Sequence, residues 1–175
     1  LPKMSFHDQL SIQLSMLDCV IACPRGHVRI VSLHLAHAAP PERIAQIERI
    51  RELQAEAGCD GGLVSGTHEN WQEDEAFPDW PKESVLLGDF NLTPDEPAYT
   101  ALAGPMDQKY GRITEIDGYL DAWILSGGHA DAGYTKFEET GNRHIDYAFV
   151  SPNLADRVPA VRVDAAAQGS DYQPL

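Results

Sequence analysis

A short apolar segment that ends in two polar side chains constrains this chain more than any other part of its sequence. Residues 84–90 read Ser-Val-Leu-Leu-Gly-Asp-Phe, which is the pattern of a buried strand. Asp89 and Asn91 close this segment two residues apart, so an extended backbone would direct both side chains to one face. A carboxylate there can activate a water, and an amide can donate to a phosphoryl oxygen. On these two residues alone, a turn that closes the strand is the better explanation.

The first part of the sequence predicts a hairpin followed by a helix. Residues 17–23 and 28–35 are apolar runs rich in β-branched side chains, and residues 24–27 between them predict a tight turn. The Pro-Pro pair at 40–41 favours the first turn of a helix, where a proline costs no hydrogen bond. Between 42 and 57 apolar residues recur three apart, and they predict one buried stripe made of Ile44, Ile47, Ile50 and Leu53.

The last part of the sequence adds another helix and two more strands. The acids within residues 93–96 favour a helix start, and residues 98–102 continue the helix. Residues 145–150 and 158–165 are the last two strand candidates. Strands mixed with helices in this order predict an α+β or layered α/β architecture.

A long segment without clear periodicity, residues 59–83, separates these two parts. A segment of this length is usually either a functional loop or disordered. Its aromatic side chains fit a lid over a substrate and fit ordinary anchoring of the loop equally well; they are Trp71, Phe77 and Trp80.

The charge balance disfavours long nucleic acid as a partner. The chain has 27 acidic and 13 basic residues and a formal net charge of −14, whereas phosphate backbones are bound mainly by Lys and Arg. This argument is weaker for a small phosphoester, for which a metal ion can supply the positive charge. We expect no membrane span, because no apolar run approaches the roughly 20 residues that cross a bilayer. Without a secretory leader, a cytoplasmic location is expected.

Three cysteines give no sign of a disulfide framework or a zinc site. Cys19, Cys23 and Cys59 are odd in number and sparse, and no second Cys pair or His pair completes a zinc site. We therefore expect free thiols in a reducing compartment.

Three further polar residues stand at positions that chemistry could use. His34 ends the second strand of the hairpin between two leucines, where a lone histidine more often belongs to the core. Asp146 interrupts an apolar strand, and a buried carboxylate without a partner is costly. Asp171 follows a Gly-Ser pair near the end, and by itself it would be an ordinary tail residue.

Together these positions form an ordered set of motifs. They run Ser32-Leu33-His34, Gly88-Asp89-Phe90-Asn91, Arg143-His144-Ile145-Asp146-Tyr147 and Ser170-Asp171-Tyr172. This set strongly resembles the endonuclease/exonuclease/phosphatase superfamily, which includes deoxyribonuclease-I-like nucleases, abasic-site endonucleases and sphingomyelinases. The resemblance extends over nearly the whole chain from residue 17 onward, and Gly-Asp-Phe-Asn is its most specific segment.

The resemblance implies a four-layer α/β/β/α sandwich that hydrolyses a phosphoester with water and a divalent metal, Mg²⁺ or Mn²⁺. Asp89 resembles the residue that aligns and activates the water, and Asn91 resembles the residue that steadies the phosphoryl group. His34 resembles a histidine that reaches the phosphate region. Asp146 resembles the carboxylate that orients a C-terminal histidine, and Asp171 resembles the acid beside that histidine, near the metal.

Two departures from the family pattern bear on activity. Tyr172, the remaining catalytic candidate, stands where the family has histidine, and a phenol that titrates near pH 10 cannot hold an imidazolium's charge. Loss of such a charged donor would cost on the order of 10²–10³ in rate. The family's metal-binding Glu lies well upstream of the strand that contains His34, and no residue before His34 matches it. Residues 1–175 are therefore expected to be the C-terminal portion of one such domain, without its N-terminal strands.

Two functions of different classes follow from these observations. The first is metal-dependent hydrolysis of a phosphoester, as a phosphodiesterase, nuclease or phosphatase, completed by an N-terminal segment or a complementary N-terminal chain. The second is a catalytically impaired relative that acts as a binding module. The acidic balance slightly favours a small phosphoester or a lipid headgroup over nucleic acid as the substrate.

Overall fold

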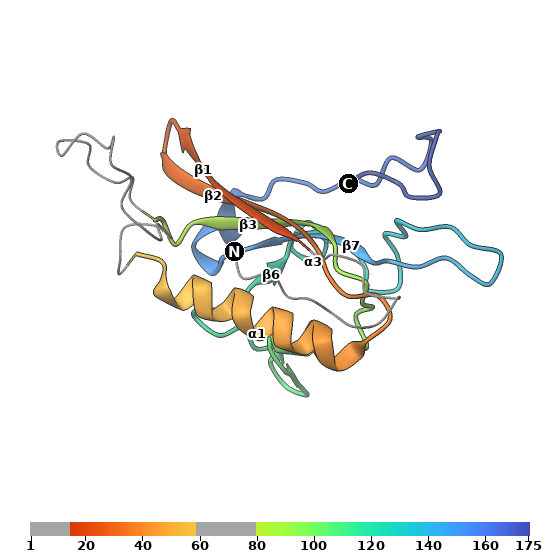
Figure 1. Ribbon diagram of the computed structural model, residues 1–175, viewed down its shortest axis with the longest axis horizontal. Coiled ribbons are helices and arrows are strands. Elements are labelled where there is room, and N and C mark those ends of the chain that lie inside the picture. The colour runs from red at the N-terminus through yellow and green to blue at the C-terminus, as the bar shows by residue number, and fades with distance from the viewer. Residues whose placement is uncertain (1–14, 59–79) are drawn as a thin grey trace, which may run out of the picture.

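The structure is a computed structural model that describes residues 15–58 and 80–175, and its main feature is one five-stranded sheet (Figure 1). The strands follow the spatial order β1-β2-β3-β7-β6. β2 and β3 run parallel, and the other neighbouring strands run antiparallel. Their bounds are β1 Met16–Cys23, β2 Gly26–His34, β3 Ser84–Asp89, β6 Leu120–Asp121 and β7 Asp146–Val150. The predicted mixed α/β class is therefore confirmed.

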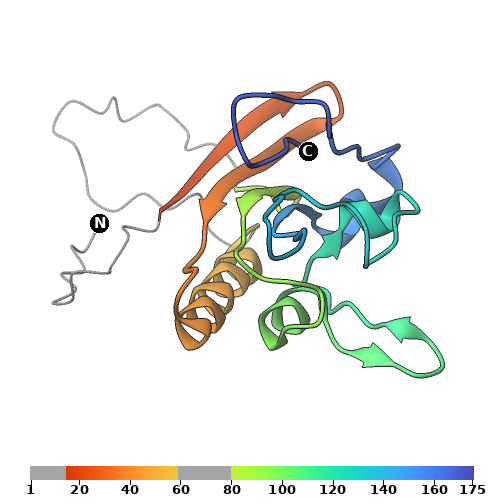
Figure 2. The ribbon, with the colours of Figure 1, turned by 90° about the vertical axis from the view of Figure 1, so that its right-hand side faces the viewer.

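Two helices cover one face of this sheet. α1 (Pro40–Glu56) and α2 (Pro97–Ala103) lie on the same side of the strands, as Figures 1 and 2 show. The remaining elements are α3 (Ala122–Leu125), the 3-10 helix η1 (Pro152–Arg157) and a separate hairpin of β4 (Met106–Asp107) and β5 (Gly111–Arg112). Among the helices of residues 15–58 and 80–175, none has the length and apolar character needed to cross a bilayer.

The hairpin and the long helix form as the sequence predicts. β1 and β2 pair along their whole length and end on the pair Cys23 and Gly26, where Gly26 takes a positive φ of 116° that suits glycine. α1 begins at Pro40, which tolerates the first helical turn because its missing amide hydrogen would be unpaired there in any case.

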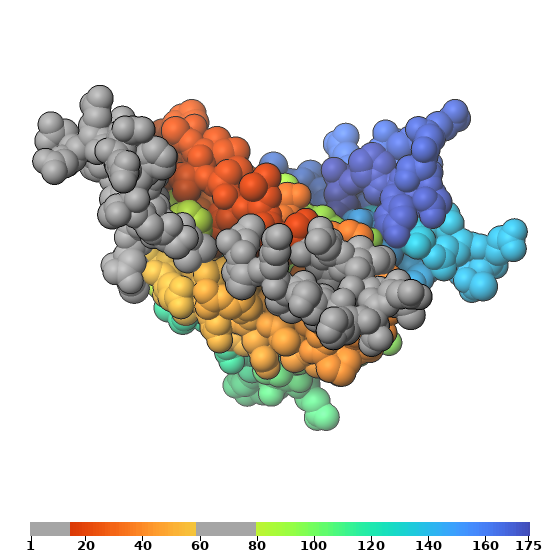
Figure 3. Space-filling model, in the orientation of Figure 1, coloured from red at the N-terminus to blue at the C-terminus, as the bar shows by residue number. Residues whose placement is uncertain are grey.

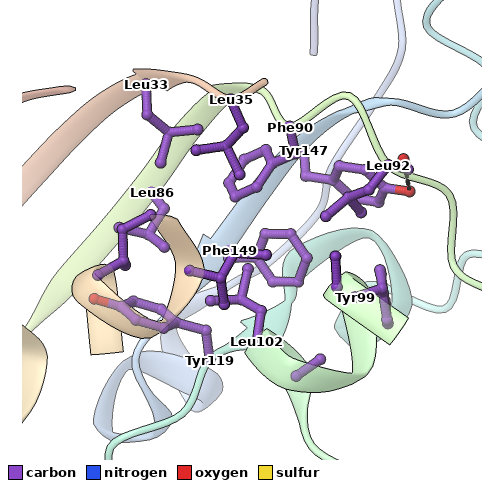
Figure 4. Packing of buried hydrophobic residues seen from close by; sticks show 14 of the residues in the cluster. Leu33, Leu35, Leu86, Phe90, Leu92, Tyr99, Leu102, Tyr119, Tyr147 and Phe149 are labelled. Atoms are coloured by element: carbon purple, nitrogen blue, oxygen red, sulfur yellow. Dashed lines mark hydrogen bonds between the residues drawn. The ribbon is translucent and has the colours of Figure 1, made fainter. Parts of the chain in front are cut away.

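Alternate side chains of the central strands point toward α1 and α2 and build the core (Figure 4). The predicted helical stripe is confirmed, because Ile47, Ile50 and Leu53 are buried and Ile44 packs against the same cluster. The strands and the chain that follows β3 contribute Val31, Leu33, Leu86, Phe90, Leu92, Tyr147 and Phe149. Burial of each large side chain of this kind contributes about 1.5–3 kcal/mol to folding.

A buried polar network closes the end of the sheet where β3 begins. The Arg29 side chain is 2% exposed, and it donates to Asp18 Oδ2 at 2.8 Å and to Gln54 Oε1 at 3.1 Å. The Ser84 hydroxyl also donates to Gln54 Oε1, at 2.9 Å. A buried guanidinium is tolerated here because a carboxylate and an amide oxygen both accept from it.

Trp80 lies at the end of the sheet where β3 begins at Ser84, and not at the opposite end, where β3 ends at Asp89. The Arg29 guanidinium lies over its ring, 4.7 Å from the ring centre. Arg29 pairs with Ser84 at the start of β3, five residues before Asp89 along the strand. Trp80 is therefore no lid over Asp89, while Trp71 and Phe77, its predicted companions, lie outside the described residues.

The opposite face of the sheet carries apolar side chains that remain exposed. Leu17, Ser32 and Leu87 lie in one cross-strand row, and Leu17 is 69% exposed and Leu87 37% exposed. Ile21, four residues further along β1 on the same face, is 46% exposed. Residues 15–58 and 80–175 form one large sheet and the small β4–β5 hairpin, so a second face-to-face sheet remains a prediction.

Two details of the predicted elements are wrong. Residues 158–165, which the structure describes, form no strand, and they follow η1 as an irregular segment in which Pro159 lacks an amide donor. The second helix begins at Pro97 and not near residue 93, because Thr93 to Glu96 forms a turn in which the Glu96 amide donates to the Thr93 carbonyl at 3.0 Å.

Gly88 is expected to be indispensable to the pairing of β2 and β3. Its φ is 138°, and a Cβ added there would lie 2.0 Å from the Leu33 carbonyl oxygen. Gly88→Ala should therefore lower the free energy of unfolding by about 3 kcal/mol or more, as measured by urea denaturation. Gly141→Ala is the matched control, because Gly141 has a φ of 135° with no atom near the added Cβ, and it should lose about 1 kcal/mol. Equal losses would contradict the importance of the Leu33 contact.

Candidate active site

His34, Asp89 and Asp146 lie in one row across three neighbouring strands. His34 at the end of β2 pairs with Asp89 at the end of β3, and Asp89 pairs with Asp146 at the start of β7. Residues paired in this way project from the same face of a sheet. The His34 Nε2 atom lies 3.7 Å from Asp89 Oδ2. Three candidate residues from separate sequence motifs thus lie together. They are at the end of the sheet that faces the viewer in Figure 2.

The strand directions explain why this end of the sheet collects polar groups. β2 and β3 are parallel, so their carboxyl ends meet, and antiparallel β7 begins beside them. Backbone pairing continues beyond the strands, because the Leu35 amide donates to the Asp89 carbonyl and the Phe90 amide donates to the Ile145 carbonyl, both at 2.9 Å. Leu35, Phe90 and Ile145 are buried, and each directly follows or precedes a residue of the row, so their burial holds the ends of the three strands in place.

Asp89 is held in place by the chain that follows it. Its Oδ1 atom accepts a hydrogen bond from the Asn91 amide at 2.8 Å. The Asp89 side chain is 15% exposed, whereas that of His34 is 47% exposed. The carboxylate is therefore fixed by the backbone, and the row opens to solvent on the His34 side.

Asn91 does not project beside Asp89 as an extended backbone would require. β3 ends at Asp89, and Asn91 takes a φ of 51°, a left-handed conformation that asparagine tolerates better than most residues. Its side-chain Nδ2 donates to the Leu35 carbonyl at 3.0 Å, and the residue is buried. The Asn91 side chain thus joins the turn to the end of β2, while its role toward a phosphoryl group remains a prediction.

Asp146 has the most perturbed carboxyl group of the row. The pKa of Asp146 is raised to about 6. Burial is the main cause and the negative charge of Asp89 adds to it, while a hydrogen bond with the Thr135 hydroxyl and the charges of His34 and Lys136 act in the opposite direction. Its Oδ2 atom is buried and has no hydrogen-bond partner among the described residues. A carboxyl group that titrates near neutrality can transfer protons in either direction.

Two residues beside Asp146 were not predicted from the sequence. The Thr135 hydroxyl accepts hydrogen bonds from the amides of Ile145 at 3.3 Å and Asp146 at 3.0 Å. The Thr135 carbonyl accepts from the Gln173 amide at 2.6 Å, which joins the C-terminal segment to this edge. Lys136 forms isolated bridges with Arg143 and Tyr172. These residues lie in an irregular segment, so no periodic pattern in the sequence indicates them.

Tyr172 and Asp171 lie on the C-terminal segment beside Lys136. The Lys136 ammonium donates to the Tyr172 hydroxyl at 3.0 Å. The Asp171 carbonyl accepts from the Phe137 amide at 3.3 Å, and Asp171 itself is exposed. The structure therefore brings Tyr172 to the β7 side of the row, and the metal-binding role predicted for Asp171 remains a prediction.

The described residues do not supply a metal site by themselves. Within residues 15–58 and 80–175, no group of three or more His, Cys, Asp or Glu side chains is arranged to hold a metal ion. The unpartnered Oδ2 atom of Asp146 offers one acceptor, which is fewer than a divalent cation requires.

A large cavity lies elsewhere and contains none of the predicted site residues. Its volume is about 820 Å³, and its lining includes Tyr99, Arg112, Asp121 and Ile124, from α2, β5, β6 and α3. Asp121 is engaged there, because its Oδ2 atom accepts from the Tyr99 hydroxyl at 2.8 Å. Its walls are mainly apolar, so the polar row at the end of the sheet, and not this cavity, is the better candidate for hydrolysis.

Comparisons with known proteins found similarity among solved structures. No family model matches the chain, and no curated protein matches it. Humanized D. rerio TDP2 is similar with a TM-score of 0.48 and 17% identity over 78% of this chain and 44% of that chain. An endonuclease/exonuclease/phosphatase family protein from Bacteroides thetaiotaomicron has a TM-score of 0.44 and 19% identity over 72% of this chain and 36% of that one.

A third structure is ANGEL2, a 2',3'-cyclic phosphatase in complex with adenosine-2',3'-vanadate. It has a TM-score of 0.43 and 17% identity, over 79% of this chain and 49% of that chain. The Bacteroides structure carries in its name the family that the sequence motifs resemble, endonuclease/exonuclease/phosphatase. The chain spans less than half the length of each of these three structures.

The charges around Asp146 give a test of the row. Asp89→Asn removes a neighbouring negative charge, so the Asp146 pKa should fall from about 6 toward its ordinary value. Lys136→Met removes a positive charge, so the Asp146 pKa should rise. Carboxyl ¹³C NMR titration measures both shifts, and Asp156→Asn, an exposed change in η1, is the control. An Asp146 pKa that is unmoved by Asp89→Asn would contradict the geometry of the row.

Proposed function

We propose that this chain carries the water-activating half of a phosphoester hydrolase site, built on His34, Asp89 and Asp146. The observation that carries the proposal is the single row that these three side chains form across β2, β3 and β7. A carboxylate, an imidazole and a carboxyl group of raised pKa are the groups that general acid–base hydrolysis of a phosphoester requires.

The chemistry divides between the two acids of the row. Asp89, fixed by the Asn91 amide, accepts a proton from water as the water oxygen forms its bond to phosphorus. The bond from phosphorus to the leaving oxygen breaks, and that oxygen takes a proton from Asp146. The pKa of about 6 keeps part of the Asp146 population protonated near neutral pH. His34, which is half exposed beside Asp89, contacts the phosphoryl group from the solvent side.

The proposal includes a divalent metal, Mg²⁺ or Mn²⁺, with Asp171 as one ligand. When bound, such an ion would polarise the phosphoryl oxygens and neutralise developing charge. The described residues do not complete a ligand set, and the steps assigned to Asp89 and Asp146 therefore use the chain's own groups.

We propose further that residues 1–175 are the C-terminal portion of a four-layer α/β/β/α domain, completed by an N-terminal segment or chain. The exposed apolar face of β1, β2 and β3 supports this arrangement, because exposed apolar surface of this kind marks a packing face. Leu17, Ile21 and Leu87 would then be covered by a second sheet. The site residues project from this same face, at its end.

The substrate class follows from charge. A net charge of −14 repels a polyanion over long distances, while a single phosphoester brings little charge to be repelled. We therefore propose a small phosphoester or a lipid headgroup as the substrate, ahead of nucleic acid.

A second candidate function is binding without turnover. The observation that favours it is the engagement of the Asn91 side chain with the Leu35 carbonyl, which leaves that amide less free to hold a phosphoryl group. Tyr172 supports the same reading, because a phenol carries no positive charge near neutral pH. Binding of a phosphate ester without hydrolysis by the intact gene product would favour this candidate.

The hydrolase proposal is tested with bis(4-nitrophenyl) phosphate and the full gene product. We expect turnover that EDTA abolishes and Mg²⁺ restores, and Asp89→Asn should lower kcat by about 10²-fold or more because it removes the base. Asp156→Asn, an exposed carboxyl in η1, is the control and should leave the rate unchanged. Turnover that persists fully in Asp89→Asn would refute the assignment of the base.

A further inference from the structure

Lys136 is held beside the candidate site by two defined contacts. Its ammonium donates to the Tyr172 hydroxyl at 3.0 Å and lies 3.0 Å from Glu138 Oε1. The same ammonium lies over the Tyr172 ring, 4.7 Å from the ring centre. The Lys136 side chain is 19% exposed, which is far less than a freely solvated lysine. These contacts restrict a side chain that is normally flexible, so the position of its charge is defined.

The backbone fixes this charge next to Asp146. Lys136 follows Thr135, whose hydroxyl accepts from the Asp146 amide, and the Lys136 backbone forms a bridge with Tyr172 on its other side. The positive charge of Lys136 is close enough to lower the pKa of Asp146. The row is thus bordered by Lys136 and Tyr172 on the β7 side, and by His34 on the β2 side.

We propose that Lys136 and Tyr172 together form an oxyanion-binding pair that holds a nonbridging oxygen of a tetrahedral phosphoryl group beside Asp146. The inference rests on the proposed function of the row and adds two specific ligands for the substrate. In this pair two residues share the properties that an imidazolium combines: Tyr172 supplies a hydroxyl donor, and Lys136 supplies the positive charge.

The hydrogen-bond inventory of the pair supports this assignment. An ammonium has three donors, of which Tyr172 and Glu138 take two, so one remains for a ligand. Because Lys136 donates to the phenol oxygen, the Tyr172 hydroxyl keeps its own hydrogen to donate. The pair therefore presents two donors, one of them charged, and charge-assisted hydrogen bonds to phosphate are the stronger kind.

Glu138 distinguishes this pair from an ordinary surface ion pair. Its carboxylate, 32% exposed, contacts the ammonium and so competes with any anion for the same charge. An arriving phosphoryl group must share Lys136 with Glu138 or displace it. Removal of the Glu138 charge should therefore strengthen anion binding, whereas removal of a carboxylate with no such contact should not.

The test measures binding of inorganic phosphate to the full gene product by isothermal titration calorimetry, so it does not depend on turnover. Lys136→Met should weaken binding by about tenfold or more, because a charged donor is lost. Lys136→Arg, which keeps the charge, should retain most of it, and Tyr172→Phe should weaken binding by a smaller factor. Glu138→Gln should tighten binding several-fold, and Glu139→Gln, its exposed neighbour, is the matched control.

The outcomes separate this inference from the proposed function. Unchanged phosphate affinity in both Lys136→Met and Glu138→Gln would overturn the inference, even if the protein hydrolyses phosphoesters. Lys136-dependent phosphate binding without any hydrolysis would support the inference and remove the proposed function. If Lys136→Met fails to fold, as judged by circular dichroism, Glu138→Gln still decides, because its tightening is expected only where Lys136 holds the anion.

Discussion

β3 is hydrogen-bonded along both of its edges, and the two registers decide where every candidate acid and base lies. On one edge β3 runs parallel to β2, and on the other it runs antiparallel to β7. A slip of one residue in either register would turn His34 or Asp146 to the opposite face of the sheet and dissolve the row. Gly88 permits the first of these pairings, because the Leu33 carbonyl occupies the space that any larger residue would need.

The two faces of the sheet differ in how far their apolar side chains are covered. The face toward α1 and α2 is filled by large side chains and forms a closed core (Figure 4). The other face carries exposed apolar side chains on β1 and β3, and the site row ends this face. In the space-filling view, the β1–β2 hairpin (orange-red) and the C-terminal segment (blue) stand apart, with a hollow between them (Figure 3). The residues of the row therefore lie at the end of the face whose apolar side chains on β1 and β3 are exposed, and the buried core lies on the other face.

The sequence predicts the regular part of this arrangement well because that part follows simple periodicity. The hairpin and α1 were predicted from alternation and from the three-residue spacing of isoleucines, and both are confirmed. The grouping of His34, Asp89 and Asp146 was expected from the family resemblance, and the paired ends of β2, β3 and β7 bring the three residues into one row. The mixed α/β class follows from the same elements.

The sequence predicts the irregular part poorly, and the reasons are physical. Asn91 was expected to continue an extended backbone, but the chain turns directly after Asp89 and uses the Asn91 side chain to join that turn to β2. Lys136 forms only isolated bridges and Thr135 lies in irregular chain beside it, so no alternation marks either residue. Residues 158–165 alternate well enough to suggest a strand, yet Pro159 removes a donor that a strand would use.

Thr135 links two properties that are usually independent, the ionisation of a carboxyl group and the docking of a distant piece of chain. Its hydroxyl contacts the start of β7, where Asp146 lies, and its carbonyl is held by the amide of Gln173. The segment that supplies the Gln173 amide also carries Tyr172, which forms a bridge with Lys136 beside the same edge. One residue therefore bears both on the ionisation of Asp146 and on the attachment of the segment that carries Tyr172.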